Sequence, residues 1–243
     1  MLIFYKLLLL QFIAHLFADF MFQPQVWAIS KRTKFISRHH FYHAAVVFAC
    51  ASILAFKDNF VVFAGILAIS HLAVDILKSY LSLKSKINES TLFFADQFIH
   101  LIIICSIIYW YWSIGSVKSY SEISLKSIAV IAAFTLCAKP SNILVKNIFL
   151  GLQIDIPKKD DSISDKNTEL PNAGKLIGLM ERFLVLALIL VGQYSAVGLI
   201  IAAKSILRFK DNQKNEYVLI GTLLSFGIAI LLGILIREIF PIY

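Results

Sequence analysis

The chain has 243 residues, of which 59% are hydrophobic and only 16% are charged, and its mean hydropathy is +0.79. A soluble domain is roughly 45–50% apolar and about 25% charged, so this composition excludes a water-soluble globular fold. The formal net charge is +8, but no nucleic-acid-binding motif accompanies it, and we expect no nucleic-acid partner. The sequence therefore predicts an all-α, polytopic membrane helix bundle.

Long apolar runs define the predicted membrane helices. A bilayer core takes about 20 apolar residues per helix, within a range of roughly 17–25. Several runs are shorter than this, so we expect about eight helices, or seven. The Lys139-Pro140 step should end or kink the fifth helix, because proline has no N–H group and clashes with the preceding turn. The runs are Leu2–Phe22, Phe41–Phe56, Phe60–Leu77, Leu92–Trp112, Leu125–Ala138, Leu176–Val191, Ser195–Leu207 and Val218–Phe240.

Lysine and arginine alternate between the connections. The odd-numbered connections hold 16 of these residues, and the even-numbered ones hold at most three. The chain is predicted to cross the cytoplasmic (inner) membrane. Because basic loops stay in the cytoplasm, both termini are predicted to face outward, and the basic loops lie against anionic headgroups. We expect two halves: residues 1–115, a four-helix half rich in His and Asp, and residues 116–243, a second membrane half with a cytoplasmic loop at 151–173.

The histidines of the first half follow a repeat. Small-His-Leu-x-x-Asp occurs in the first helix with His15 and Asp19, and again in the third with His71 and Asp75. The second helix begins with His39 and His43, and the fourth begins with Asp96 and His100, at nearly the same spacing. One helical hairpin therefore appears twice in tandem, which predicts a pseudo-twofold axis along the membrane normal.

Residues four apart share a helix face, so the repeat also predicts depth. Four histidines lie at a similar level, beneath a layer that is nearer the cytoplasm. The histidines are His15, His43, His71 and His100, and the layer is Asp19, Asp75, Asp96 and His39. Histidine and aspartate are ligands for Zn²⁺, Mn²⁺ or Fe, and a carboxylate can orient a ligand histidine. The pattern predicts a divalent metal site, with zinc as the first choice; interhelical polar packing is the alternative.

Charged residues of the second half admit two interpretations. In the first, Glu181 and Lys204 form an ion pair and Arg208 extends to the interface. In the second, Lys175, Lys204 and Arg208, beside Glu181, bind a phosphate or a lipid headgroup.

With these residues in view, the chain resembles an uncharacterised bacterial integral-membrane family, domain of unknown function 3307. The resemblance covers about the first 110 residues, and parts of the second half are similar to longer members. It implies a membrane location and no established activity. The residues that carry it are His15, Asp19, Gln23, Trp27, His43, His71, Asp75, Lys78, Asp96, Gln97 and His100.

Three functions are compatible with the predicted site. The first is a metal-dependent hydrolase of a lipid or amphiphile at the cytoplasmic leaflet, in which the metal activates water. The four histidines, with Asp19 or Asp75, would be ligands, and one aspartate, Asp96 by preference, would be the general base. The second function is a metal-ion or proton transporter. The third is a membrane subunit or effector, in which an oligomer or a partner bound through the Gln153–Pro171 loop supplies the activity.

Overall fold

The computed structural model describes residues 1–56, 58–115, 123–154, 173–209 and 216–240. Within these ranges the chain forms helices joined by turns, and it contains no strand. The all-α class is therefore confirmed for the described residues. Contacts divide the chain into two units, Met1–Thr135 and Leu136–Tyr243.

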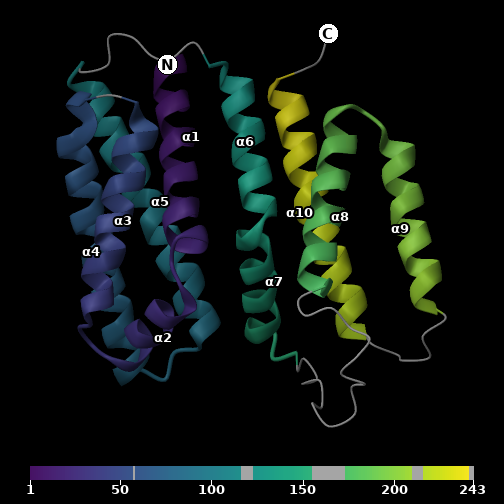
Figure 1. Ribbon diagram of the computed structural model, residues 1–243, viewed down its shortest axis with the longest axis horizontal. Helices are drawn as coiled ribbons and strands as arrows, with labels where there is room; N and C mark the ends of the chain where they lie inside the picture. Colours follow the sequence, from purple (N-terminus) through teal and green to yellow (C-terminus); the bar gives the residue numbers. More distant parts are fainter. Residues whose placement is uncertain (57, 116–122, 155–172, 210–215, 241–243) are drawn as a thin grey trace. The chain divides into compact units, whose positions relative to one another are not determined.

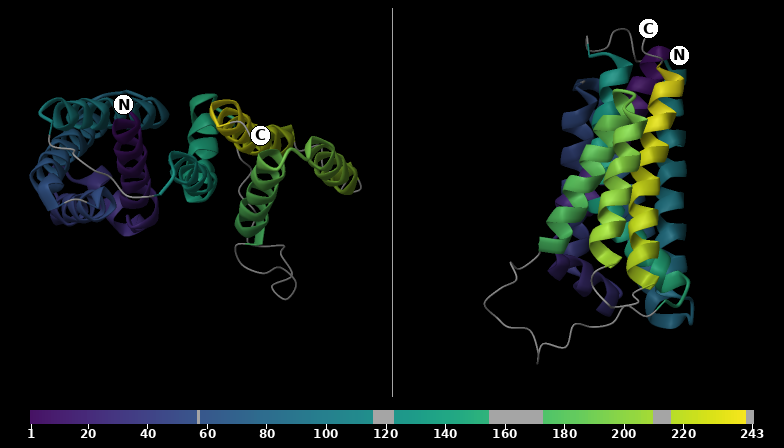
Figure 2. Two further views of the ribbon diagram at one scale, coloured as in Figure 1. Left: turned by 90° about the horizontal axis from the view of Figure 1, so that it is seen from above. Right: turned by 90° about the vertical axis from the view of Figure 1, so that its right-hand side faces the viewer.

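Four long helices of the first unit form a ring (Figures 1 and 2). They are α1 (Leu2–Leu16), α3 (Arg38–Ala55), α4 (Val61–Lys84) and α5 (Glu89–Ser113). α1 packs against α3 and α5, and α4 packs against the same two helices. α1 thus lies diagonally across from α4, and α3 lies across from α5. A twofold rotation that exchanges the α1–α3 hairpin with the α4–α5 hairpin would give this order.

A short helix, α2 (Gln25–Thr33), lies at the end of the ring opposite the N-terminus (Figure 1). It contacts α3 and α4. Residues 23–40 were expected to form a connection, because the segment of α2 is too short and too basic to be predicted as a membrane helix. Just before it, α1 ends in a π-helical turn, η1 (Phe17–Met21).

Hydrogen-bonding side chains fix where α3 and α5 begin. Ser37 caps α3 by accepting from the backbone N–H of His39, and Ser37 N–H donates to Nδ1 of His40 at 3.1 Å. Asn88 caps α5 by accepting from the N–H of Ser90 at 3.0 Å. Such caps satisfy N–H groups that have no partner within the helix. They set the register of α3 and α5, and with it the height of the polar residues further along each helix.

The interior of the ring is divided along its length. The half nearer the N-terminus is an apolar core in which the rings of Phe60 and Phe63 stack on each other and each packs edge to face with Tyr111. The buried side chains of this core are Leu7, Ala51, Ala55, Phe60, Phe63, Ala64, Leu67, Ile104, Ile107, Ile108 and Tyr111. The half nearer α2 holds the histidines and aspartates. An apolar core therefore closes one end of the ring, and the polar residues lie toward the other.

Every one of the eight apolar runs is helical in the described residues. Four helical segments among them are long and apolar enough to cross a membrane: Leu2–Met21, Val61–Lys84, Glu89–Ser113 and Leu219–Ile239. A bent pair of helices would make a fifth. Large apolar side chains on the outer surface are consistent with contact with lipid. The chain is therefore suited to a membrane, and eight crossings stay a prediction.

The bent pair is α6 (Leu125–Cys137) and α7 (Lys139–Gly151), whose axes differ by 50°. Pro140 lies in the first turn of α7, where its missing N–H group costs nothing. The expected kink at Lys139-Pro140 is confirmed. The chain continues as a helix after it, in a segment that was expected to be a connection.

The second unit is completed by α8 (Ala173–Leu190), α9 (Tyr194–Phe209) and α10 (Glu216–Ile239). α10 packs against α7 and α8, and α9 packs against α8. Most of the predicted cytoplasmic loop at 151–173 lies outside the described residues.

Candidate metal centre

Seven ionisable side chains from the four ring helices and η1 lie in one buried cluster. Each of them is exposed by 10% or less. Histidines from α1, α3, α4 and α5 point inward, as the depth argument from the sequence predicted. The cluster consists of His15, Asp19, His43, His71, Asp75, Asp96 and His100.

Three ligand atoms at the centre of this cluster form a nearly equilateral triangle. His43 Nε2 and His71 Nε2 are 3.0 Å apart, and they lie 3.3 Å and 3.4 Å from Asp19 Oδ1. Ligands bound to zinc at about 2.0–2.1 Å in a tetrahedron lie roughly 3.3 Å from one another. The triangle therefore has the dimensions of one face of a tetrahedral zinc site. Asp75 Oδ2 lies 3.8 Å from both histidine nitrogens.

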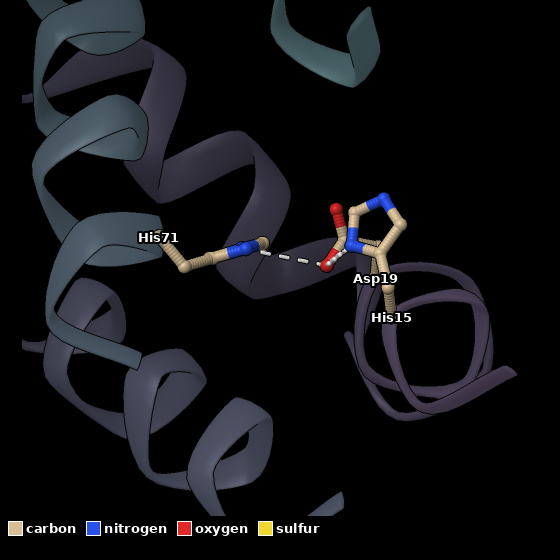
Figure 3. A group of neighbouring side chains, drawn as sticks. All are labelled: His15, Asp19 and His71. Carbon is tan, nitrogen blue, oxygen red and sulfur yellow. Dashed lines mark ion pairs between the residues drawn. The ribbon is translucent and has the colours of Figure 1, made fainter. Parts of the chain in front are cut away.

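Figure 3 shows how His15 and His71 approach the same carboxylate from different helices. His15 Nδ1 lies 3.6 Å from Asp19 Oδ1, and His71 approaches from α4. Asp19 belongs to the π-helical turn, and π-turns inside helices occur frequently at functional sites. The sequence predicted an ordinary helix here, because a π-turn has no sequence signal comparable to proline.

Lysines pair with two of the three aspartates. Lys31 of α2 reaches Asp75 at 2.6 Å, and Lys78 of α4 reaches Asp96 at 2.7 Å. No lysine or arginine of the described residues pairs with Asp19. With neutral histidines, the three carboxylates and two ammonium groups leave one net negative charge. A buried uncompensated charge is costly, so the cluster favours an added cation.

Gln97 links the two sides of the cluster. Its side-chain amide donates to Asp96 Oδ2 at 3.2 Å and to Asp19 Oδ2 at 3.5 Å. Its Oε1 lies 3.2 Å from His15 Nε2. Supporting contacts of this kind hold ligand side chains in one orientation.

Some polar atoms of the cluster are buried without a hydrogen bond among the described residues. They are Asp19 Oδ1, Asp96 Oδ1, His43 Nδ1 and His100 Nε2. Asp96 Oδ1 and His100 Nε2 lie 3.3 Å apart and pair with each other. Buried polar atoms are almost always satisfied in proteins, so Asp19 Oδ1 and His43 Nδ1 are the atoms that call for a further partner. A metal ion would serve Asp19 Oδ1 directly. The donor set, histidine nitrogen with carboxylate oxygen, suits Zn²⁺, Mn²⁺ or Fe.

A small cavity lies on the apolar side of the cluster. It measures about 20 Å³ and is bordered by His15, His71, His100 and Gln11. That is room for roughly one water molecule. Gln11 donates to the carbonyl of Ala51 at 3.0 Å across this cavity wall.

Two further histidines of α3 lie outside the cluster. His39 was placed in the aspartate layer by the spacing, but it stacks on Trp27 of α2 with ring centres 6.0 Å apart. The reason is α2 itself, which covers that face of α3. His40 caps α3 and lies 3.0 Å from the Ser79 hydroxyl, which ties α3 to α4.

In the second unit, Lys204 and Glu181 form an ion pair, as in the first of the two interpretations of these residues. Lys175 lies exposed on the first turns of α8. The side chain of Arg208 lies outside the described residues. The sequence analysis missed Lys31 and Lys78 as partners of the aspartates, because both read as interfacial loop charges.

Comparison with known proteins identifies the family of this chain. No curated protein and no solved structure matches the chain. Residues 7–132 match the family described as "Protein of unknown function (DUF3307)". This segment contains the whole His/Asp cluster and covers just over half of the 243 residues. The chain therefore belongs to the DUF3307 family.

Proposed function

We propose that this protein binds a divalent metal ion inside its membrane-embedded ring, through His43, His71 and Asp19. The single observation that carries this proposal is the triangle of ligand atoms with sides of 3.0, 3.3 and 3.4 Å. His15 and Asp75 are positioned to complete the site. Zinc is the first choice, and manganese or iron are the alternatives, because this donor set suits all three.

We propose further that the metal supports hydrolysis of a lipid or amphiphile at the cytoplasmic leaflet. A metal in such a site supplies an activated water and polarises the bond to be cleaved. Asp96 is the proposed general base. Lys78 and Gln97 hold its Oδ2, while Oδ1 has no hydrogen bond among the described residues and lies 3.3 Å from His100 Nε2. One oxygen is thus fixed, and we assign the role of proton acceptor to the other oxygen, Oδ1, beside His100.

Transport of a metal ion or a proton is the second candidate. The ring order favours it, since parallel repeats around an axis along the membrane normal occur in transporters with a site between the copies. The apolar core beyond the cluster favours the hydrolase, because the cavity on that side of the cluster has room for about one water.

Asp96→Asn separates the two candidates. If Asp96 is the base, the variant should keep its metal and lose hydrolysis by roughly 10²–10⁴-fold. The measurement is breakdown of phosphatidylglycerol and phosphatidylethanolamine by mass spectrometry, with metal content measured on the same samples. Loss of metal together with activity would show that Asp96 is a ligand. Uptake of zinc into liposomes by the wild type, without lipid breakdown, would establish transport instead.

The proposed orientation places α2 and the basic connections in the cytoplasm, following the bias of 16 basic residues to three. In a variant without native cysteines, Lys86→Cys should be protected from an impermeant thiol reagent in intact cells. Ser113→Cys, at the other end of α5, should react. Both positions are exposed in the structure. The reverse labelling pattern would put the metal centre at the outer leaflet and refute the proposed topology.

A further inference from the structure

The second unit holds a polar cavity of its own, separate from the metal cluster. Its volume is about 220 Å³, and its walls come from α7, α8, α9 and α10. Three glycines, Gly174, Gly178 and Gly221, line it and leave room for a group to enter. Two basic residues, Arg182 and Lys204, border the same space.

Arg182 is a buried cation whose partners are neutral. Arg182 as a whole residue is only 2% exposed. Nε donates to the carbonyl of Cys137 at 2.6 Å, Nη2 donates to Asn142 Oδ1 at 2.9 Å, and Nη1 donates to Ser225 Oγ at 2.9 Å. The Cys137 carbonyl can accept this hydrogen bond because α6 ends at Cys137, and carbonyl groups in the last turn of a helix have no N–H partner within the helix. These contacts fix the guanidinium but do not neutralise it.

The other charges at the cavity cancel each other. Glu181 is paired with Lys204, so it is occupied as a counterion. The three charged residues among those lining the cavity therefore sum to one net positive charge. An isolated charge inside a membrane protein is costly, and an anion beside it would lower that cost. A Cβ on Gly178 would lie 3.4 Å from Arg182 Nη1, so glycine keeps the approach to this nitrogen open.

We propose that this cavity binds a phosphate oxyanion through Arg182, with Lys204 beside it. Nη2 also donates to the carbonyl of Ala138 at 3.4 Å, so the second N–H group of Nη1 is the donor that these bonds leave for a phosphate oxygen. Arginine is the usual choice for a buried contact with phosphate, and such a charge-assisted hydrogen bond is stronger than one between neutral groups. The phosphate would come from a phospholipid headgroup or from free inorganic phosphate. The site is independent of the metal centre, since all its residues belong to the second unit. The anion is thus assigned to Arg182, whereas the sequence-based interpretation named Lys175 and Arg208 together with Lys204.

Binding is tested on the purified full-length protein in detergent. Inorganic phosphate is titrated by calorimetry, and phosphatidylglycerol adducts are counted by native mass spectrometry, with phosphatidylglycerol-free detergent as the reference. We expect saturable binding of at least one probe, weakened at least tenfold in Arg182→Gln and unchanged in Lys146→Gln. Lys146 is an exposed lysine of α7 that does not border the cavity. Binding of both probes in competition supports a site for the phosphate group itself, and adducts with lipid alone support a headgroup site.

Arg182→Gln removes several hydrogen bonds, so a second variant covers the case in which it does not fold. Gly174→Leu leaves every charge in place and adds bulk at the cavity, where a Cβ meets no atom within 4 Å. It should fold normally and lose the bound anion. Wild-type protein that binds neither probe would overturn the proposal. So would Arg182→Gln or Gly174→Leu that folds and binds as tightly as the wild type.

Discussion

Replacing His71 with alanine should remove the bound metal almost completely. His71 is the most central ligand: its Nε2 lies 3.0 Å from His43 Nε2, 3.4 Å from Asp19 Oδ1 and 3.8 Å from Asp75 Oδ2. Loss of a supporting residue near a metal costs about 10–100-fold in affinity, so loss of this ligand should cost more than that. The measurement is the zinc, manganese and iron content of detergent-purified protein by mass spectrometry. Wild-type protein should carry about one metal per chain.

His39→Ala is the matched control for this substitution. His39 lies on α3 one turn from His43, but it stacks on Trp27 and contributes nothing to the cluster. It should keep the metal content of the wild type. If wild-type protein, loaded with zinc and then desalted, holds no metal, the proposed metal site is wrong. If His71→Ala keeps its metal while its fold is intact by circular dichroism, the ligand assignment is wrong.

The metal content of His100→Ala distinguishes a site with one metal ion from a site with two. The ring of His100 stacks on that of His71, with centres 3.9 Å apart and planes at 12°, but its Nε2 faces Asp96. Asp75, Asp96 and His100 form another group that could hold a metal, and it shares Asp75 with the group of His43 and His71. A single ion at the triangle should survive this substitution. A fall from two ions to one would show that the cluster is binuclear.

The sequence predicted the helix bundle, and that histidines and aspartates of four helices meet in it, because both depend on spacing; His39, which the spacing also placed there, stacks on Trp27 instead. His15 with Asp19, and His71 with Asp75, are four residues apart, and such pairs share a helix face whatever the surroundings. The positions of the helices were likewise predicted from the sequence alone, because each apolar run is a local feature of the chain. The Lys139-Pro140 break followed from the covalent structure of proline, and the structure shows it as a 50° bend.

The features that the sequence did not give depend on contacts between distant segments. Lys31 meets Asp75 because α2 folds back over the end of the ring, and nothing in residues 25–33 indicates that direction. The role of Arg182 could not be predicted from the sequence for a similar reason. Its acceptors, the Cys137 carbonyl and Ser225, come from helices more than 40 residues away in each direction. A charge in an apolar run shows that a partner is needed, but it does not say which one.

Lys31→Met should destabilise the metal-free protein by about 3–5 kcal/mol, the cost of breaking a buried ion pair by removing one partner. The Lys31 and Asp75 side chains are 10% and 7% exposed, and they lie 2.6 Å apart. The substitution leaves the carboxylate buried without its counterion. The measurement is the free energy of unfolding in mixed detergent micelles with a chelator present. Lys31→Met/Asp75→Leu should recover most of the loss, because no charge is then stranded.

Arg32→Met is the control on the same helix. Arg32 also pairs with a carboxylate, Glu89, at 3.0 Å, but the two side chains are 58% and 56% exposed. An exposed ion pair contributes roughly 0–1 kcal/mol, so this variant should unfold nearly as the wild type does. If Lys31→Met costs no more than Arg32→Met, then Lys31 is not the counterion of Asp75 in the folded protein.

Added zinc should stabilise Lys31→Met by more than it stabilises the wild type. With neutral histidines, the substitution changes the net charge of the cluster from −1 to −2. A divalent cation therefore compensates more buried charge in the variant than in the wild type. A ligand that binds the folded state stabilises it according to its affinity, so the larger gain in unfolding free energy would measure the tighter binding. An equal gain in both proteins would mean that Asp75 does not take part in metal binding, and that the metal is held by His43, His71 and Asp19 alone.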